Sequence, residues 1–148
     1  MTVGSGTLLL IEDNEHDVLF MKRALNSAEI TNALQVVADG QSAIDYLAGS
    51  GQYADRNQFP LPCLVFLDLK LPVKGGLEVL SWMRQQPALQ TIIVIVLTTS
   101  REPNDIQTAY RLGGNSYVVK PTDVTRLVEM LRALKHYWLT FNEFAGRC

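Results

Sequence analysis

Four short apolar runs of the sequence end in side chains that can carry charge or bind an anion. The residues that follow these runs are Glu12 with Asp13, Asp68, Thr98, and Lys120. In an open parallel α/β sheet, ligand sites form outside the carboxyl ends of the strands. If the four runs are strands of one such sheet, we expect these five side chains to lie together at one edge.

Three carboxylates in one place repel each other unless a cation compensates them. At a separation of ~4 Å and an effective dielectric near 20, each like-charged pair costs about 4 kcal/mol. Mg²⁺ prefers oxygen ligands and suits such a cluster, and Lys120 adds a second cation. With both cations present, the charges of Glu12, Asp13 and Asp68 are balanced, and the site can accept an incoming phosphoryl group.

Phosphoryl transfer also gives each remaining side chain a role. Asp68 can attack phosphorus as the nucleophile, while the metal ion and Lys120 spread the transition-state charge. The Thr98 hydroxyl can donate to a phosphoryl oxygen. Each residue also has a purely structural interpretation: Asp68 as an ordinary strand-end carboxylate, Glu12 and Asp13 as helix caps, Thr98 as a turn residue, and Lys120 as a solvated loop lysine.

The elements that must position these residues follow from the hydrophobic pattern. Five strand-length apolar runs alternate with amphipathic segments that repeat at helical spacing. Three runs are nearly continuous, which fits strands buried on both faces of a parallel sheet. The runs are residues 8–11, 34–37, 64–67, 92–97 and 117–119. The pattern predicts a three-layer, doubly wound (βα)₅ α/β fold with helices on both faces.

Length and composition bound this interpretation. The chain of 148 residues is 47% hydrophobic and 19% charged, which is typical of one globular domain. We expect a tail at residues 1–6, a domain at residues 7–139 and an extension at residues 140–148. A connector at residues 49–60 is unusually long, and it is either functional or a tolerated surface insertion.

Charge and hydropathy exclude several classes of protein. A net charge of −2 argues against direct DNA binding. The longest clean apolar run, residues 92–97, is far shorter than the ~20 residues that a membrane helix needs. The first residues carry no positive region followed by an apolar stretch, so we expect no signal peptide and a cytoplasmic location.

The motif set resembles the receiver domain of two-component response regulators over about residues 7 to 138. The acidic pair ends the first strand, and Asp68 begins the segment Asp-Leu-Lys-Leu-Pro-Val-Lys-Gly-Gly. Thr98 follows 30 residues later, and Lys120 with Pro121 follows 22 residues beyond that. Tyr117 stands three residues before the lysine, where the family places its switch aromatic.

The resemblance implies a flavodoxin-like sheet with the strand order 2-1-3-4-5. It implies a signalling protein rather than an enzyme, which takes a phosphoryl group from a sensor histidine kinase onto Asp68 and hydrolyses it slowly. Mg²⁺, with Mn²⁺ as a substitute, would be held by Glu12, Asp13, Asp68 and the backbone carbonyl of Lys70. Thr98 and Tyr117 would couple phosphorylation to a changed interaction surface.

Two features of the chain resemble those of one subfamily of small receivers. The long connector before the third strand and the C-terminal extension resemble the regulators partnered with cyanobacterial and bacterial phytochromes. This resemblance implies a phytochrome as the sensor kinase, and a downstream partner that the sequence does not name.

Two other kinds of protein use a similar set of residues. A haloacid dehalogenase-type phosphatase also uses Asp, Thr, Lys and Mg²⁺, but its nucleophile motif needs a second Asp where this chain has Lys70. That family also places its nucleophile on the first strand, whereas in this chain the first apolar run is followed by the acidic pair Glu12-Asp13. A degenerate receiver that serves only as a docking module would not need the intact set of site residues.

The apolar pattern near the C-terminus predicts a helix and a further contact. Its apolar stripe begins after Asp123 and continues through Tyr137, Trp138, Leu139, Phe141 and Phe144. A helix over residues 123–141 spans roughly 28 Å, whereas a five-residue strand covers about 17 Å. We expect the distal end to overhang the sheet and to form a homodimer, with Trp138 and Phe141 as anchors. The alternative is a tail that folds back over its own domain.

Overall fold

The computed structural model describes residues 6–146, in which five parallel strands alternate with five α-helices. The strands are β1 (Leu8–Ile11), β2 (Leu34–Val37), β3 (Leu64–Leu67), β4 (Ile93–Thr98) and β5 (Ser116–Val119). The helices are α1 (Glu15–Ser27), α2 (Gly40–Ala48), α3 (Gly76–Gln85), α4 (Pro103–Arg111) and α5 (Val124–Leu134). The expected tail lies outside the described residues except for Gly6, as do the last two residues of the extension.

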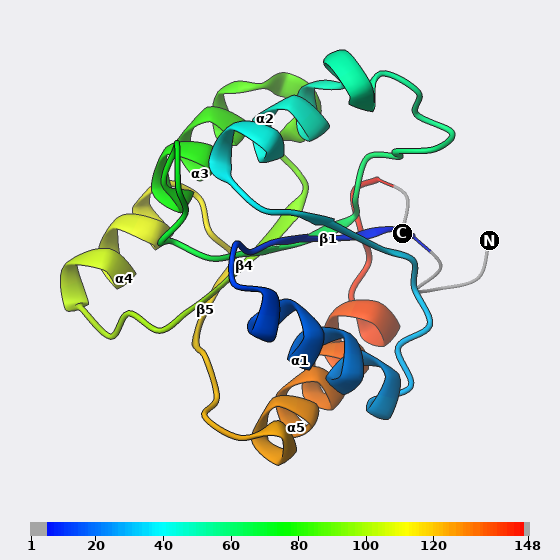
Figure 1. Cartoon of the computed structure of the whole chain (residues 1–148), viewed down its shortest axis with the longest axis vertical. Coiled ribbons are helices and arrows are strands. Elements are labelled where there is room, and N and C mark those ends of the chain that lie inside the picture. The colour runs from blue at the N-terminus through cyan, green and yellow to red at the C-terminus, as the bar shows by residue number, and fades with distance from the viewer. Residues whose placement is uncertain (1–5, 147–148) are drawn as a thin grey trace.

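The strands form one sheet in the order β2-β1-β3-β4-β5 (Figure 1). All neighbouring pairs are parallel. Helices α1 and α5 cover one face of the sheet, and α2, α3 and α4 cover the other, which gives three layers (Figure 1). The predicted doubly wound fold and strand order are therefore confirmed.

The core lies on both faces of the central strands. All four residues of β1 and all four of β3 are buried, as the continuous apolar runs predict. On the α1–α5 face, Leu10 and Phe66 pack with Leu131. On the opposite face, Leu9 and Val65 pack in a separate cluster with helices α2 and α3. This double burial fixes the positions of the strand ends.

Capping residues and a proline mark where three of the helices begin. Asn14 caps α1 by accepting from the Asp17 N–H at 3.1 Å. Asp123 caps α5 in the same way, and Pro103 occupies the first turn of α4, where its missing N–H costs nothing. Among residues 6–146, no helix has the length and hydropathy of a membrane span.

The long connector at residues 49–60 is ordered by contacts of its own. Arg56 donates to the carbonyl oxygens of Tyr46 at 2.7 Å and Leu47 at 2.9 Å, both near the end of α2. The ring of Tyr53 lies against those of Tyr46 and Phe59, with centroids 5.2 and 5.1 Å apart. The connector therefore packs on α2 and contributes to the core on that face.

The C-terminal helix departs from the sequence expectation. After α5 the chain continues as a π-helix over Lys135–Phe141. The hydrogen bonds of a π-helix join residues i and i+5, and Leu139, five residues after Leu134, lies on the same buried side. Trp138 and Phe144 also pack against the core, while Tyr137 and Phe141 stay exposed. The expectation that the distal end overhangs the sheet is wrong for Trp138, Leu139 and Phe144, whose side chains pack on the core.

Candidate functional site

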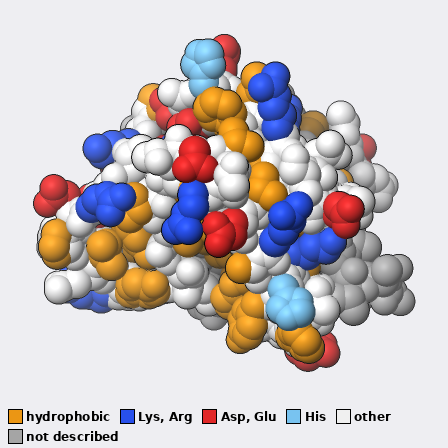
Figure 2. Space-filling model, turned by 90° about the horizontal axis from the view of Figure 1, so that it is seen from below, with side chains coloured by type: hydrophobic (Ala, Val, Ile, Leu, Met, Phe, Trp, Pro, Cys, Tyr) orange, Lys and Arg blue, Asp and Glu red, His pale blue; other side chains and the backbone are white. Residues whose placement is uncertain are grey.

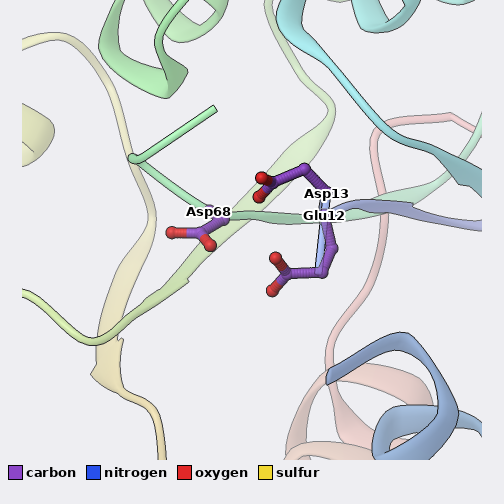
Figure 3. Close-up of side chains that lie close together, drawn as sticks. All are labelled: Glu12, Asp13 and Asp68. Atoms are coloured by element: carbon purple, nitrogen blue, oxygen red, sulfur yellow. The ribbon is translucent and has the colours of Figure 1, made fainter. Parts of the chain in front are cut away.

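The acidic cluster forms where β1 and β3 end side by side. Ile11 pairs with Leu67 in the sheet register, so the next residues, Glu12 and Asp68, leave the same edge together. One carboxylate oxygen from each of Glu12, Asp13 and Asp68 lies within 4.8 Å of the others. Figure 3 shows the three side chains extending to the same side of the strand ends. Asp13 is exposed, whereas Glu12 and Asp68 are buried.

Lys120 supplies the cation of the site from the end of β5. Its Nζ lies 2.5 Å from Glu12 Oε1 and 3.0 Å from Asp68 Oδ2. Its backbone N–H donates to the Thr98 carbonyl at 2.8 Å, which fixes the lysine beside the end of β4. The structure thus brings Glu12, Asp68 and Lys120 together, as the strand-end pattern predicts.

Sequence reasoning missed a third partner of this lysine. Asp17 Oδ2 lies 2.7 Å from Lys120 Nζ, and the Asp17 side chain is 36% exposed. Asp17 lies in the first turn of α1, and its side chain reaches the same edge as the acidic pair. Its closeness in sequence to Glu12 and Asp13 was the available signal. The site therefore contains four carboxylates rather than three.

Burial and ion pairing shift the pKa values of the central pair. Burial raises the pKa of Glu12 to about 7, against the opposing effect of its hydrogen bond with Lys120. Burial alone would lower the pKa of Lys120, but its contacts with Asp17, Glu12 and Asp68 raise it above the ordinary value. Lys120 therefore stays charged at neutral pH, and Glu12 is the group that takes up a proton.

Thr98 lies at the end of β4 with its hydroxyl unpaired. The residue is fully buried, and its Oγ1 has no hydrogen-bond partner among the described residues. An unsatisfied buried hydroxyl costs roughly 1–3 kcal/mol, so such groups call for an explanation. A phosphoryl oxygen arriving at the strand ends would give this hydroxyl an acceptor.

Tyr117 connects the same edge to helix α4. Its ring packs with Leu69, Val96 and Ala109, and its hydroxyl donates to the Ser100 carbonyl at 3.0 Å. Burial raises the pKa of the Tyr117 hydroxyl, so this group remains a donor at neutral pH. Ser100, two residues after Thr98, is buried and was not singled out from the sequence.

The loop after Asp68 is held close to the site. Gly76, the first residue of α3, has no room for a side chain, because a Cβ atom there would lie 2.2 Å from the Asp68 carbonyl oxygen. The Lys70 N–H donates to Asp68 Oδ1 at 3.2 Å, so Lys70 lies beside the acidic cluster, and its side chain is exposed.

The cluster suits a divalent cation with oxygen ligands. Two buried carboxylates and one exposed carboxylate converge, and carboxylate oxygens are the protein ligands that Mg²⁺ and Mn²⁺ prefer. Trp138 and Phe141 do not belong to this site. Trp138 is half-buried against the core, and Phe141 is 67% exposed on the π-helix.

Comparisons with known proteins agree with this geometry. Residues 8–132 match the family model described as the response regulator receiver domain. The chain is 36% identical to the response regulator Rcp1 of Synechocystis over 132 residues, which are 89% of this chain and 88% of that protein. It is 37% identical to the probable methanogenesis regulatory protein FilR2 of Methanothrix harundinacea, over 94% of this chain and 87% of FilR2.

Solved structures show the same arrangement of elements. The phosphorylated cyanobacterial phytochrome response regulator RcpA aligns with a TM-score of 0.88 and 33% identity, covering 95% of this chain and 99% of RcpA. The Mn²⁺-bound form of Rcp1 aligns with a TM-score of 0.85 at the same identity and coverage. One relative is thus known in a phosphorylated form and another in a metal-bound form.

Proposed function

The chain belongs to the response regulator receiver family, and from that premise we propose that Asp68 accepts a phosphoryl group from the phosphohistidine of a sensor kinase. The observation that carries the proposal is the contact between Asp68 and Lys120 inside the acidic cluster, where Nζ lies 3.0 Å from Oδ2. A nucleophilic carboxylate is thereby held next to a fixed cation, which phosphoryl transfer requires.

Each site residue has a role in this reaction. An oxygen of Asp68 attacks phosphorus while the bond to the kinase histidine breaks, and Lys120 neutralises charge on the phosphoryl oxygens. The Thr98 hydroxyl donates to one of these oxygens. Hydrolysis of the acyl phosphate by water later returns Asp68 and inorganic phosphate.

We assign the metal site to Glu12, Asp13, Asp68 and the Lys70 carbonyl, with Glu12 reaching the ion directly or through water. When bound, Mg²⁺ or Mn²⁺ polarises the phosphoryl oxygens and offsets the negative charge of the cluster. The convergence of the three carboxylates supports this assignment, as does the Mn²⁺-bound relative.

Thr98 and Tyr117 would form the switch. A phosphoryl oxygen that attracts the Thr98 hydroxyl changes the packing at the end of β4, beside the Ser100 carbonyl that Tyr117 now contacts. Movement of the Tyr117 ring would then alter the surface of α4 and β5. A downstream protein that binds the two surfaces differently would read the signal in the cytoplasm.

We propose a phytochrome as the sensor kinase, since the similar regulator RcpA is described as a cyanobacterial phytochrome response regulator. We also propose a homodimer that uses the exposed side of the π-helix, with Phe141 as its anchor and Trp138 behind it. The exposed rings of Tyr137 and Phe141 support this contact.

The class of function is tested by intact-mass spectrometry after incubation with acetyl phosphate and Mg²⁺. We expect the wild-type protein to gain one phosphoryl group and Asp68→Asn to gain none. If wild type and Asp68→Asn both remain unmodified, with acetyl phosphate and with a phosphorylated phytochrome kinase alike, the chain is a docking module and the proposal is wrong.

A further inference from the structure

Lys120 has more carboxylate partners than phosphoryl transfer can leave in place. An ammonium group has three N–H donors, and here three carboxylates surround it: Glu12 at 2.5 Å, Asp17 at 2.7 Å and Asp68 at 3.0 Å. A phosphoryl group on Asp68 brings new anionic oxygens to the same nitrogen. One of the three carboxylates must then lose its hydrogen bond with Lys120.

The three partners differ in how easily they can return to water. The side chains of Glu12 and Asp68 are only 4% and 8% exposed, whereas that of Asp17 is 36% exposed. Separating a buried carboxylate from its cation is costly, whereas a half-exposed one is rehydrated. Asp17 also lies in the first turn of α1, where the helix dipole favours a negative charge without the lysine.

Room for this exchange is present next to the lysine. A small cavity of about 50 Å³ lies between α1 and the chain after β5, and Glu12, Asp17, Phe20 and Lys120 are among the residues that line it. Figure 2 shows the face covered by α1 and α5, where acidic and basic side chains are interspersed. The Asp17 carboxylate therefore borders a space large enough to admit water when the ammonium leaves it.

From these contacts we infer that Asp17 is a competing counter-ion, which holds Lys120 in the unphosphorylated protein and releases it when Asp68 carries a phosphoryl group. The inference rests on the proposed function. It adds Asp17 as a positioning residue that lowers the rate of phosphorylation. Asp17 does not touch the reacting atoms. It acts through Lys120 and opposes phosphorylation, whereas Glu12 and Asp68 keep their contacts with the lysine.

The test is the rate of phosphorylation by acetyl phosphate at saturating Mg²⁺, measured for wild type, Asp17→Asn, Asp17→Glu and Glu15→Gln. Glu15→Gln is the matched control, because Glu15 is exposed in the same helical turn and has no ion pair with Lys120. It removes the same charge from α1 but leaves the lysine contact intact.

We expect Asp17→Asn to be phosphorylated about two- to fivefold faster than Glu15→Gln, which is the change for a partly exposed ion pair of up to about 1 kcal/mol. Asp17→Glu, which keeps the charge, should behave as wild type. A merely structural role for Asp17 in holding Lys120 predicts the opposite sign, a slower reaction.

Two outcomes separate this inference from the proposed function. If Asp17→Asn reacts no faster than Glu15→Gln while wild type is phosphorylated on Asp68, the competition is disproved and the proposed function stands. If no protein in the set, wild type included, gains a phosphoryl group, the proposed function fails and the inference falls with it.

Discussion

The Nζ atom of Lys120 lies 2.5 Å from Oε1 of Glu12, whose side chain is only 4% exposed. A fixed cation and a buried acid thus share the edge of the sheet with Asp68. The contact forms because β5 and β1 end at the same edge, although Glu12 and Lys120 are more than one hundred residues apart in the sequence. The contact between Lys120 and Glu12 therefore links the charge balance of the site to the stability of the folded protein.

Replacing this lysine tests that link. Lys120→Met should slow phosphorylation by roughly 100-fold, since a preorganised charge at the reacting group is lost. It should also raise the pKa of Glu12 further above the unfolded value. A carboxyl whose pKa is raised on folding is stabilising below its unfolded pKa, and that contribution is lost as the pH rises through the folded pKa.

The variant should therefore lose more stability, relative to wild type, at pH 8 than at pH 6. Urea unfolding at the two pH values measures this difference, and Lys22→Met serves as an exposed control outside the acidic cluster. An equal loss of stability at both pH values would show that Glu12 does not depend on the lysine charge.

Metal binding should depend on pH through the same carboxyl. Because the pKa of Glu12 is raised to about 7 in the metal-free protein, a proton competes with the cation below that pH. We expect Mg²⁺ affinity to rise between pH 6 and pH 8, by less than tenfold per pH unit, in calorimetric titrations. Glu12→Gln should remove this dependence, and Asp13→Ala should abolish most binding.

The buried hydroxyl of Thr98 predicts opposite effects on stability and function. Thr98→Val keeps the shape but removes an unpaired polar group, so the free energy of unfolding should rise by about 1 kcal/mol. Phosphorylation should nevertheless become slower and the acyl phosphate shorter-lived. Reduced stability in urea unfolding would mean that the hydroxyl already has a partner in the unphosphorylated protein.

The same variant tests the switch. In wild type, phosphorylation should change the NMR signals of the Tyr117 ring, which Tyr117→Phe identifies. In Thr98→Val that change should be absent or strongly reduced. An equal change in both proteins would remove Thr98 from the signalling route.

The dimer proposal depends on the exposed side of the π-helix. Phe141→Ser should shift a micromolar sample toward monomer in sedimentation velocity, while Leu61→Ser, at an exposed apolar residue elsewhere, should not. Circular dichroism checks that both variants fold. A monomeric wild-type protein, or a dimer that is indifferent to Phe141→Ser, contradicts the proposal.

The sequence predicts the centre of the sheet well because β1 and β3 are continuous apolar runs, each with a carboxylate directly after it. The register of Ile11 with Leu67 then follows from parallel pairing, and with it the meeting of Glu12 and Asp68. Asp17 was missed because its role depends on the direction of α1 relative to Lys120, and strand ends alone do not show that direction.

The expected overhang of the C-terminal helix was wrong in part, for a different reason. The predicted end of the helix, residue 141, agrees with the structure, in which helical structure ends at Phe141. However, the change from an α-helix to a π-helix at Lys135 rotates the apolar residues, and no local residue pattern announces this change. Leu139 is buried as a result, and Trp138 is half-buried instead of presenting its full ring to a partner.

The most direct test of the central claim is to locate the phosphoryl group. After treatment with acetyl phosphate and Mg²⁺, borohydride reduces an aspartyl phosphate to homoserine, and peptide mapping by mass spectrometry identifies the modified position. We predict homoserine at position 68 and at no other carboxylate, with none formed when Mg²⁺ is chelated. Modification at Glu12, Asp13 or Asp17 instead, or at no position in a protein that remains folded, would contradict the assignment of Asp68 as the acceptor.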